Sequence, residues 1–268
     1  MIAECKKMEI PVLPPSANES FQGFSVVRKD NEPDKIRFGL TTIKNFGEGI
    51  ADTIVKERKK NGRFFSIADF LNRIKDRNLN KKSLESLIMS GALDEFEDRG
   101  VLFANLELLL AFHKEHMSGN ETQDSLFGLM SDKESLPTLK LTPAEKANAE
   151  MKLTWEKELL GLYISGHPLD KHKEKLEKGG ITVSKIKENP REGLSVALGG
   201  IVEEVREITT KGNDRMAFGR ISDFTGPIDV VLFPKIFAEI KDIFVPDSCI
   251  GIYGKISKRN GEISLIIE

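Results

Sequence analysis

The chain has 268 residues, of which 39% are hydrophobic and 31% are charged, and its formal net charge is −2 at pH 7. This length allows one to three globular cores, and the absence of a long apolar run excludes a helical membrane protein. The two cysteines, Cys5 and Cys249, lie far apart in sequence, which argues against a disulfide framework. Because no secretory leader pattern opens the chain, we expect a cytoplasmic protein.

Positive charge is concentrated in one block of the sequence. The stretch from Lys35 to Lys82 carries thirteen basic and five acidic residues, a net charge of +8, so the remainder of the chain carries −10. A charge run usually forms a solvated face, but such a local excess of cations also suits a partner that carries phosphates.

The first 116 residues divide into two segments. Residues 1–31 mix prolines with polar residues and show no sustained period, which is typical of the end of a preceding domain. Residues 32–116 follow a helical period, with Ile50 and Ile54 four positions apart. Ser66 and Asp69 have the spacing of a capping box, and a later helix is expected to stop at Gly91. We therefore expect an all-helical domain over 32–116.

The stretch "TIKNFGEGIADTIVKERKK", residues 42–60, has the spacing of a helix-hairpin-helix motif. Its tight turn requires positive φ, which glycine adopts freely and which asparagine tolerates, and Asn45 stands where the motif usually has glycine. Backbone N–H groups at the start of the next helix then attract phosphate oxygens, which positions DNA without reading its sequence. The expected duplex contacts are Lys44, Asn45, Phe46, Gly47, Glu48, Gly49, Lys56, Arg58, Lys59, Lys60 and Arg63.

Two further features of this region have competing interpretations. An ordinary helical hairpin is the alternative for residues 42–60, whereas residues 90–93, "SGAL", are a candidate for a second hairpin that would complete a tandem pair. His113 and His116 have a spacing found in metal sites. No second ligand pair accompanies them, so we expect a surface helix and no metal site.

Residues 117–141 are polar and rich in turn signals, which predicts a linker. Thr142, Pro143 and Glu145 then combine an N-cap, a proline at the first helical position and a capping glutamate. We therefore expect a helix from Thr142 to about Tyr163, within a helical connector over 142–193.

The period changes after Leu194. Four β-branched stretches are separated by turn signals, among them "KGN" at 211–213 and "NG" at 260–261, and the helical passage "PKIFAEIKDIF" precedes the last two strands. Five strands in about 75 residues, with a helix before the fourth, are typical of an OB barrel. An immunoglobulin-like sandwich would need about seven strands and no such helix. The predicted fold class is α+β multidomain, an all-α helix-hairpin-helix domain followed by a five-stranded OB-fold β-barrel over 194–268.

The barrel offers candidate contacts to a single strand. Lys211, Arg215, Lys258 and Arg259 fall on loops that flank an OB binding face, and Phe218 is a candidate for base stacking, as is Phe233. The alternative is that both phenylalanines belong to the core. Because 194–268 carries nine basic and eleven acidic residues, any grip on a single strand should be weak.

The order of several blocks resembles the C-terminal half of the alpha subunit of bacterial DNA polymerase III, the C-family of replicative polymerases. These blocks are "IRFGL", "IKNFGEGIADTIVKER", "LNKKSLESLIMSGALDEF", "EKELLGLYISGHPLD" and "TKGNDRMAFGRISDFTGPIDVVLFP". The resemblance implies that 1–31 ends a fingers region, that a tandem helix-hairpin-helix grips duplex DNA and that the barrel lies near the single-stranded template. It also implies partners in the other subunits of the polymerase III holoenzyme.

The same resemblance gives a role to the linker and to parts outside the chain. The pentapeptide "QDSLF" resembles the motif that binds the sliding clamp, with Gln123 and Ser125 at the rim and Leu126 and Phe127 as apolar anchors. The alternative is that Leu126 and Phe127 cover a helix of this chain. The family's catalytic aspartates, with Mg²⁺ and dNTPs, belong to an upstream palm domain that nothing here matches. We therefore expect no cofactor in this chain and no activity of the chain alone.

A second class of function stays open from the sequence, a standalone adaptor with a nucleic-acid-binding barrel and a helical interaction domain. Catalytic carboxylates encoded upstream in the same gene would decide for the polymerase.

Overall fold

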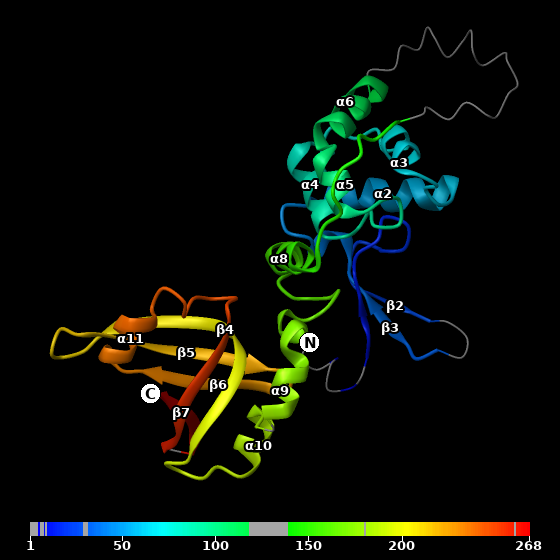
Figure 1. Cartoon of the computed structure of the whole chain (residues 1–268). Coiled ribbons are helices and arrows are strands. Elements are labelled where there is room, and N and C mark those ends of the chain that lie inside the picture. Colours follow the sequence, from blue (N-terminus) through cyan, green and yellow to red (C-terminus); the bar gives the residue numbers. More distant parts are fainter. Residues whose placement is uncertain are drawn as a thin grey trace, which may run out of the picture. The chain divides into compact units, whose positions relative to one another are not determined.

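The computed structural model describes residues 10–28, 32–117, 139–179, 181–259 and 261–268, together with Cys5 and Met8. The chain divides into two compact units, Met1–Gly166 and His167–Glu268 (Figure 1). Among the described residues, no helix has both the length and the apolar character needed to cross a membrane.

The first unit combines a small sheet with a set of helices. In the sheet the strand order is β1-β3-β2, with β1 parallel and β2 antiparallel to β3. The strands are β1 Val12–Leu13, β2 Ser25–Val27 and β3 Lys35–Arg37. The helices are η1 Leu40–Thr42, α2 Glu48–Asn61, α3 Ile67–Arg73, α4 Lys81–Met89, α5 Arg99–Ala104, α6 Leu106–Met117 and α8 Ala149–Leu160.

The apolar faces of these helices share one core. Ile50 and Ile54 on α2 are both buried, as their spacing predicted, and they pack in the same cluster as Leu84 of α4. Ala17, which comes from the segment 1–31, is buried in this cluster too. The first compact unit thus takes in that segment and the first part of the segment 142–193 as well as the helices between them.

Two helix boundaries of the first unit follow local sequence signals. The Ser66 side chain accepts a hydrogen bond from the Asp69 N–H at 3.1 Å, which confirms the predicted N-cap of α3. The Asp69 carboxylate bonds the N–H of Phe65 at 2.9 Å, one residue before the position that a capping box uses. Helix α4 ends at Met89, and Gly91 follows at φ +82°, in the left-handed region that glycine adopts without strain.

The predicted helix start at Thr142 is wrong, because α8 begins at Ala149 with Asn148 as its cap. The segment before it is held in non-helical form by its neighbours. Asn105 accepts from the Thr142 N–H at 2.8 Å and donates to the Thr142 carbonyl at 2.9 Å, and Asp98 accepts from the Ala147 N–H. These tertiary hydrogen bonds outweigh the local capping signal.

A buried ion pair fixes α8 against α5. Arg99 donates to Glu156 at 2.9 Å, and both side chains are almost fully buried. The second carboxylate oxygen of Glu156 accepts from the N–H groups of Ile164 and Ser165. Glu156, the first glutamate of "EKELLGLYISGHP", therefore holds the end of this unit in place. Removing one partner of such an ion pair leaves an uncompensated buried charge.

The second unit is a closed barrel with short helices before it. Its elements are η2 Pro168–His172, α9 Lys173–Gly179, α10 Val183–Glu188, β4 Ser195–Thr209, β5 Arg215–Asp223, β6 Gly226–Leu232, α11 Pro234–Ile240, β7 Cys249–Arg259 and β8 Glu262–Ile267. The strands close in the order β4-β5-β6-β8-β7, with β6 parallel to β8. Five strands with α11 before the fourth confirm the predicted OB barrel and exclude the sandwich.

The barrel turns use the residues that the sequence singled out. Asn213 in the β4–β5 turn adopts φ +65° and Gly261 in the β7–β8 turn adopts φ +85°. Arg259 pairs with Glu262 across the β7–β8 ladder, so the connection is a two-residue loop, and residue 260 itself lies outside the described residues.

Candidate nucleic-acid interface

The first hairpin places the start of α2 at the surface. Asn45 adopts φ +64°, which confirms the expected positive φ at this position. Phe46 is buried in the core and the Lys44 N–H donates to the carbonyl of Leu159 at 2.9 Å, so both sides of the turn are fixed. Gly47 is the N-cap of α2, and no side chain caps the helix. Among the described residues, no side chain thus accepts from the first N–H groups of α2.

The fold itself does not require glycine at position 47 or at position 49. Gly47 has φ −78°, and Gly49 has no positive φ. A Cβ atom built on either residue meets nothing within 4 Å. Their absent side chains leave the backbone open to close approach by a ligand, which is one of the uses of glycine in proteins.

The predicted cations of α2 do not cluster at this cap. Gly49, Lys56 and Lys60 follow one exposed stripe of α2, since residues seven and four apart share a helix face. At ~1.5 Å rise per residue, the stripe from Gly49 to Lys60 is about 16 Å long. These three of the predicted duplex contacts therefore form a line along α2 and not a single patch.

Partners within the chain neutralise about half of the basic block. Of its thirteen cations, the side chains in ion pairs are Lys35, Arg37, Lys56, Arg63, Arg73 and Lys81. Within the described part of the chain, those without an ion pair are Lys44, Arg58, Lys59, Lys60, Lys75, Arg77 and Lys82. Arg58 instead donates to backbone carbonyls. The net field of the block is thus weaker than its count of charges indicates.

Arg58 and Arg63 serve the fold as well as the surface. Arg58 donates to the carbonyls of Ala17 and Ser20 at 2.7 and 2.8 Å, and burial lowers the pKa of its guanidinium. Arg63 pairs with Glu95 at 2.6 Å. Of the predicted cations of α2, Lys59 and Lys60 are therefore the most available to a partner, and Lys59 also lies 5.4 Å from the ring of Phe21.

Two cations near the cap were counted in the basic block but were not predicted as contacts. Lys75 and Arg77 are exposed on either side of Asp76, and the Asp76 carboxylate accepts from Thr53 of α2 at 2.8 Å. The Thr53 hydroxyl also lies 3.1 Å from the carbonyl of Gly49. This contact brings the loop after α3 to the first turns of α2, which local sequence patterns cannot reveal.

The candidate second hairpin, between α4 and α5, is closed by the chain itself. Asp98 caps α5 by accepting from the N–H of Gly100 at 2.9 Å, and it also accepts from Ala147 and from Lys152 at 2.8 Å each. Desolvation alone would raise the pKa of the Asp98 carboxyl, but the Lys152 ammonium and the two backbone N–H groups lower it below its ordinary value. The start of α5 is thus occupied by an internal anion.

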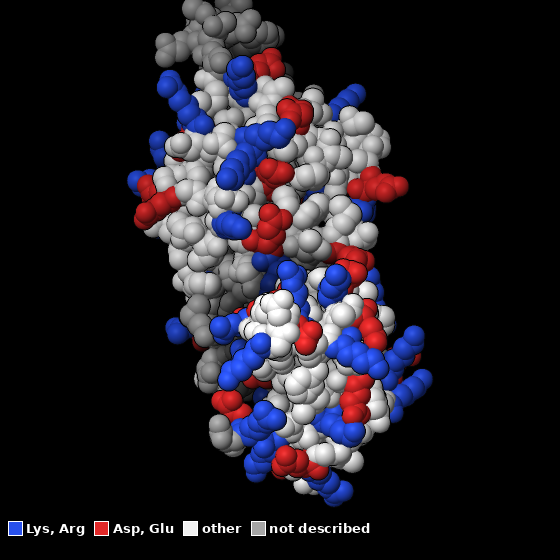
Figure 2. Space-filling view, turned by 90° about the vertical axis from the view of Figure 1, so that its left-hand side faces the viewer, with Lys and Arg blue, Asp and Glu red and all other residues white. Residues whose placement is uncertain are grey.

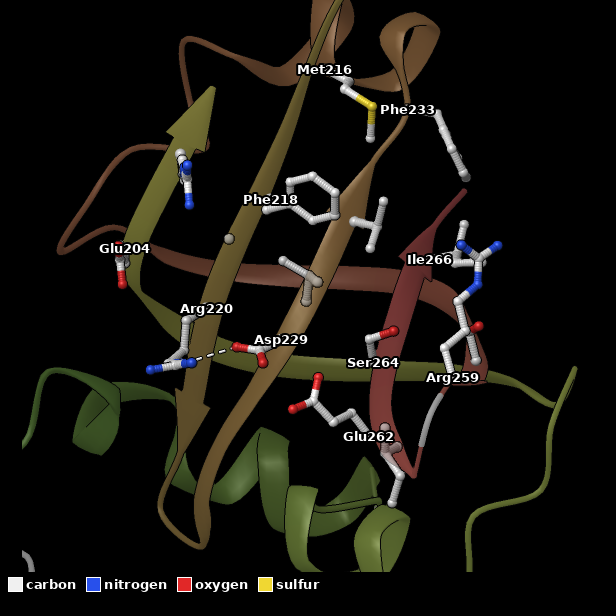
Figure 3. A pocket seen from close by; sticks show the side chains of 16 residues that line it. Glu204, Met216, Phe218, Arg220, Asp229, Phe233, Arg259, Glu262, Ser264 and Ile266 are labelled. Carbon is white, nitrogen blue, oxygen red and sulfur yellow. Dashed lines mark hydrogen bonds and ion pairs between the residues drawn. The ribbon is translucent and has the colours of Figure 1, made fainter. Parts of the chain in front are cut away.

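The barrel presents an outward face with a cavity of about 410 Å³ (Figure 3). Phe218, Phe233 and Arg259 line it, and both rings are close to half exposed, so neither belongs to the core alone. Arg206 and Arg220 line the same cavity but were not predicted. Both lie inside strands, whereas the prediction considered the cations near the turns. Arg215 lies 3.8 Å from Glu207, and Lys211 and Lys258 do not line the cavity.

Charge of both signs is mixed on one face of the molecule. On the face shown in Figure 2, lysine and arginine side chains alternate with aspartate and glutamate, and no broad field of one sign is visible. On this face, a contact with a polyanion must therefore come from particular cations and N–H groups.

The predicted clamp contacts Gln123, Ser125, Leu126 and Phe127 lie outside the described residues. Within the described part of the chain, no group of three or more His, Cys, Asp or Glu side chains could hold a metal ion. His113 is buried and bonds the carbonyl of Ile74 at 2.9 Å, whereas His116 stacks on Phe112. The expectation of a surface helix thus holds for His116 and is wrong for His113.

Both units match known families of protein module. Residues 9–102 match the family model described as helix-hairpin-helix motif, and residues 196–268 match the OB-fold nucleic acid binding domain. The chain is therefore a helix-hairpin-helix domain followed by an OB-fold domain, as predicted.

The particular relatives are alpha subunits of DNA polymerase III. The chain is 35% identical to that of Borreliella burgdorferi over 272 residues, which cover 100% of this chain and 23% of the relative. It is 35% identical to that of Thermus aquaticus (96% and 20% covered) and 32% identical to that of Bacillus subtilis (98% and 23%). The predicted resemblance is confirmed: the chain is related over its whole length to a segment of this subunit. It spans about a fifth of the length of these curated relatives.

Proposed function

We propose that this chain is the DNA-handling part of a replicative DNA polymerase, in which the α2 hairpin binds duplex phosphates and the barrel binds single-stranded template. The whole protein would be a cytoplasmic DNA-directed DNA polymerase, with Mg²⁺ and dNTPs bound at a palm domain outside this chain. The observation that carries the proposal is the uncapped start of α2 between two glycines that the fold does not need. Sequence similarity to the alpha subunits supports it.

The line of contacts on α2 fits a sugar-phosphate backbone. A stripe of about 16 Å corresponds to roughly five steps of the duplex at ~3.4 Å each. The N–H groups at Gly47–Gly49 would hold one phosphate, and Lys59 and Lys60 would reach further along the strand. Lys44, Lys75 and Arg77 would contribute near the cap.

The test is duplex binding by the full chain across a salt series. The double variant Lys44→Gln with Lys60→Gln removes two unpaired cations, so the slope of log affinity against log salt should fall by nearly two, and affinity by about tenfold. The matched control is Lys35→Gln with Lys81→Gln, which removes the same charge from lysines that pair with Glu32 and Glu107 at 2.6 Å each. Equal changes in both doubles would contradict a site on α2.

We also propose that the pentapeptide from Gln123 to Phe127 binds the sliding clamp, on the strength of its sequence alone. An extended pentapeptide gives up chain entropy for a small contact, so its affinity should be on the order of micromolar, and DNA binding would raise the local clamp concentration. Replacing Leu126 and Phe127 by alanine should abolish binding to a bacterial clamp in a pull-down with DNA affinity unchanged. A lower melting temperature in that variant would assign the two residues to a core.

A standalone adaptor that uses the same two domains is the competing proposal. It predicts that the gene encodes no catalytic carboxylates upstream of this chain. Sequencing the complete gene decides between them, and it bears only on the parent protein and not on the DNA contacts of α2.

A further inference from the structure

The outward face of the barrel is organised in two rows of side chains. Alternate residues of a strand share a face, and the pairing of β4, β5, β6 and β8 aligns these residues across the sheet. The first row consists of Arg206, Phe218, Val231 and Ile266. The second row, two residues further along each strand, consists of Glu204, Arg220, Asp229 and Ser264. The cavity of about 410 Å³ spans both rows.

The first row offers a flat apolar surface. Phe218 is 44% exposed and neighbours Val231 across the ladder, with Ile266 next in the row. Phe233, which is 45% exposed, borders the same end of the cavity (Figure 3). Exposed rings on the face of a barrel are suited to stacking with a nucleobase. Arg206 at the end of this row makes no ion pair with the described residues, so it is available to a phosphate.

The second row has more acceptors than donors. Arg220 donates through Nε to Oδ1 of Asp229 at 2.8 Å, and Glu204 stands across from Arg220. Glu262 lies two residues before Ser264 on the same face of β8, and its side chain makes no hydrogen bond or ion pair within the described part of the chain. In Figure 3 the carboxylates of Asp229 and Glu262 point toward one another at the polar end of the cavity.

Three carboxylates in this place weaken the attraction to a phosphate backbone. A face that bound single strands only by charge and stacking would favour cations here. The two rows lie ~6.8 Å apart, at ~3.4 Å per residue, so a base stacked on Phe218 brings its hydrogen-bonding edge over the second row, where Arg220 is paired with Asp229. Carboxylates at that edge accept from amino groups and repel carbonyl oxygens.

We propose that this face selects a nucleobase that bears an exocyclic amino group and disfavours thymine. The inference rests on the proposed function, since it requires that the barrel binds a single strand. Cytosine is the pyrimidine of this class: its N4 amino group donates to Asp229 and Glu262, whereas thymine places its O4 acceptor at the same position. Phe218 holds the ring of either base, so the preference comes from the second row alone.

The experiment compares two strands that differ in this group. Binding of the full chain to dC12 and dT12 is measured by fluorescence anisotropy at one salt concentration, because both are pyrimidine homopolymers of equal charge. We expect dC12 to bind about tenfold more tightly, the factor for one well-paired base edge. Asp229→Asn with Glu262→Gln should raise affinity for both strands, because two negative charges are removed, and should bring the ratio close to one.

The matched control makes the same chemical change elsewhere on the second unit. Asp242→Asn with Glu239→Gln removes one aspartate and one glutamate charge outside the cavity, so the ratio should stay near ten. Equal affinities of the unmodified chain for dC12 and dT12 would overturn the base preference and leave the proposed single-strand binding intact. Failure of the unmodified chain to bind either strand would overturn both.

Discussion

The two hairpins of the first unit use similar residues for opposite purposes. At α2, Gly47 and Gly49 face open space, and no side chain caps the helix. At α5, a Cβ on Gly100 would lie 2.3 Å from the backbone nitrogen of Ala147, and Asp98 caps the helix. A glycine pattern thus marks an outward site only where the fold leaves room around it, because elsewhere the same residue makes space for the chain's own backbone.

The comparison also concerns charge. The Asp98 carboxylate lies at the start of α5 and pairs with Lys152. The partial positive charge of this helix end is therefore already neutralised within the chain. The start of α2 has only Glu48 in its first turn, exposed to solvent. We therefore expect DNA to contact α2 and not α5, so that a tandem pair of hairpins would act through one of its members.

The largest expected effect breaks the closed hairpin. Gly100→Ala forces a Cβ into backbone atoms of the segment 145–147, so it should destabilise the first unit by about 3 kcal/mol or more. Urea unfolding followed by the fluorescence of Trp155, the only tryptophan, reports on this unit because its ring packs on Phe103. Gly23→Ala, where a Cβ meets nothing within 4 Å, is the control and should change stability little. An equally stable Gly100→Ala would show that the α5 turn is not packed as described.

A smaller effect concerns the internal anion at α5. The pKa of Asp98 is lowered in the folded chain, so its ionised form stabilises the fold above the pKa of the unfolded chain, and this stability is lost as pH falls through the folded pKa. Asp98→Ala should cost about 1–2 kcal/mol at pH 7, from the lost cap and the lost partner of Lys152.

The pH dependence gives the control for this prediction. The cost of Asp98→Ala should shrink as pH falls from the ordinary pKa of the unfolded carboxyl through the lowered pKa of the folded one. Asp98→Asn keeps a capping side chain and should be less destabilising at pH 7. A cost that does not change with pH, measured by urea unfolding, would assign the effect to packing.

The smallest effect sharpens the open hairpin. Glu48 is the acidic residue in the first turn of α2, so it should repel a phosphate that docks at Gly47–Gly49. Glu48→Gln should raise duplex affinity about two- to threefold at low salt, an effect that screening removes at high salt. Glu107→Gln, on the exposed side of α6, removes the same charge and should leave affinity unchanged. An affinity that falls in Glu48→Gln would place the phosphate elsewhere.

The sequence was sufficient for the features that depend on local chemistry. The positive φ of Asn45, the N-cap at Ser66 and the five strands with α11 all follow from residue type and spacing. Phe218 and Arg259, both predicted as single-strand contacts, line the cavity of the barrel, although Arg259 ends strand β7 and does not lie on a loop. Each of these depends on neighbours a few residues apart.

Features that depend on distant partners could not be predicted. The sequence shows Arg58 as a cation of α2, but its hydrogen bonds to Ala17 and Ser20 form only when the N-terminal segment packs on that helix. The start of α8 differs from the prediction for the same reason, since Asn105 and Asp98 hold the preceding segment in a non-helical form. Which charges remain available to a ligand is therefore a tertiary property, even where the motif itself is local.

The most direct test of an open α2 start is the double variant Gly47→Ala with Gly49→Ala. Both new methyl groups enter open space, and alanine at Gly49 should stabilise the helix by about 0.5–1 kcal/mol. Glycine is preferred over alanine at an N-cap, so the change at Gly47 offsets the gain at Gly49 and the Trp155 unfolding transition should move little. The same methyl groups stand where a phosphate would approach the backbone, so duplex affinity should fall by about tenfold or more. Duplex affinity that is unchanged in this stable variant would contradict a phosphate site at the start of α2.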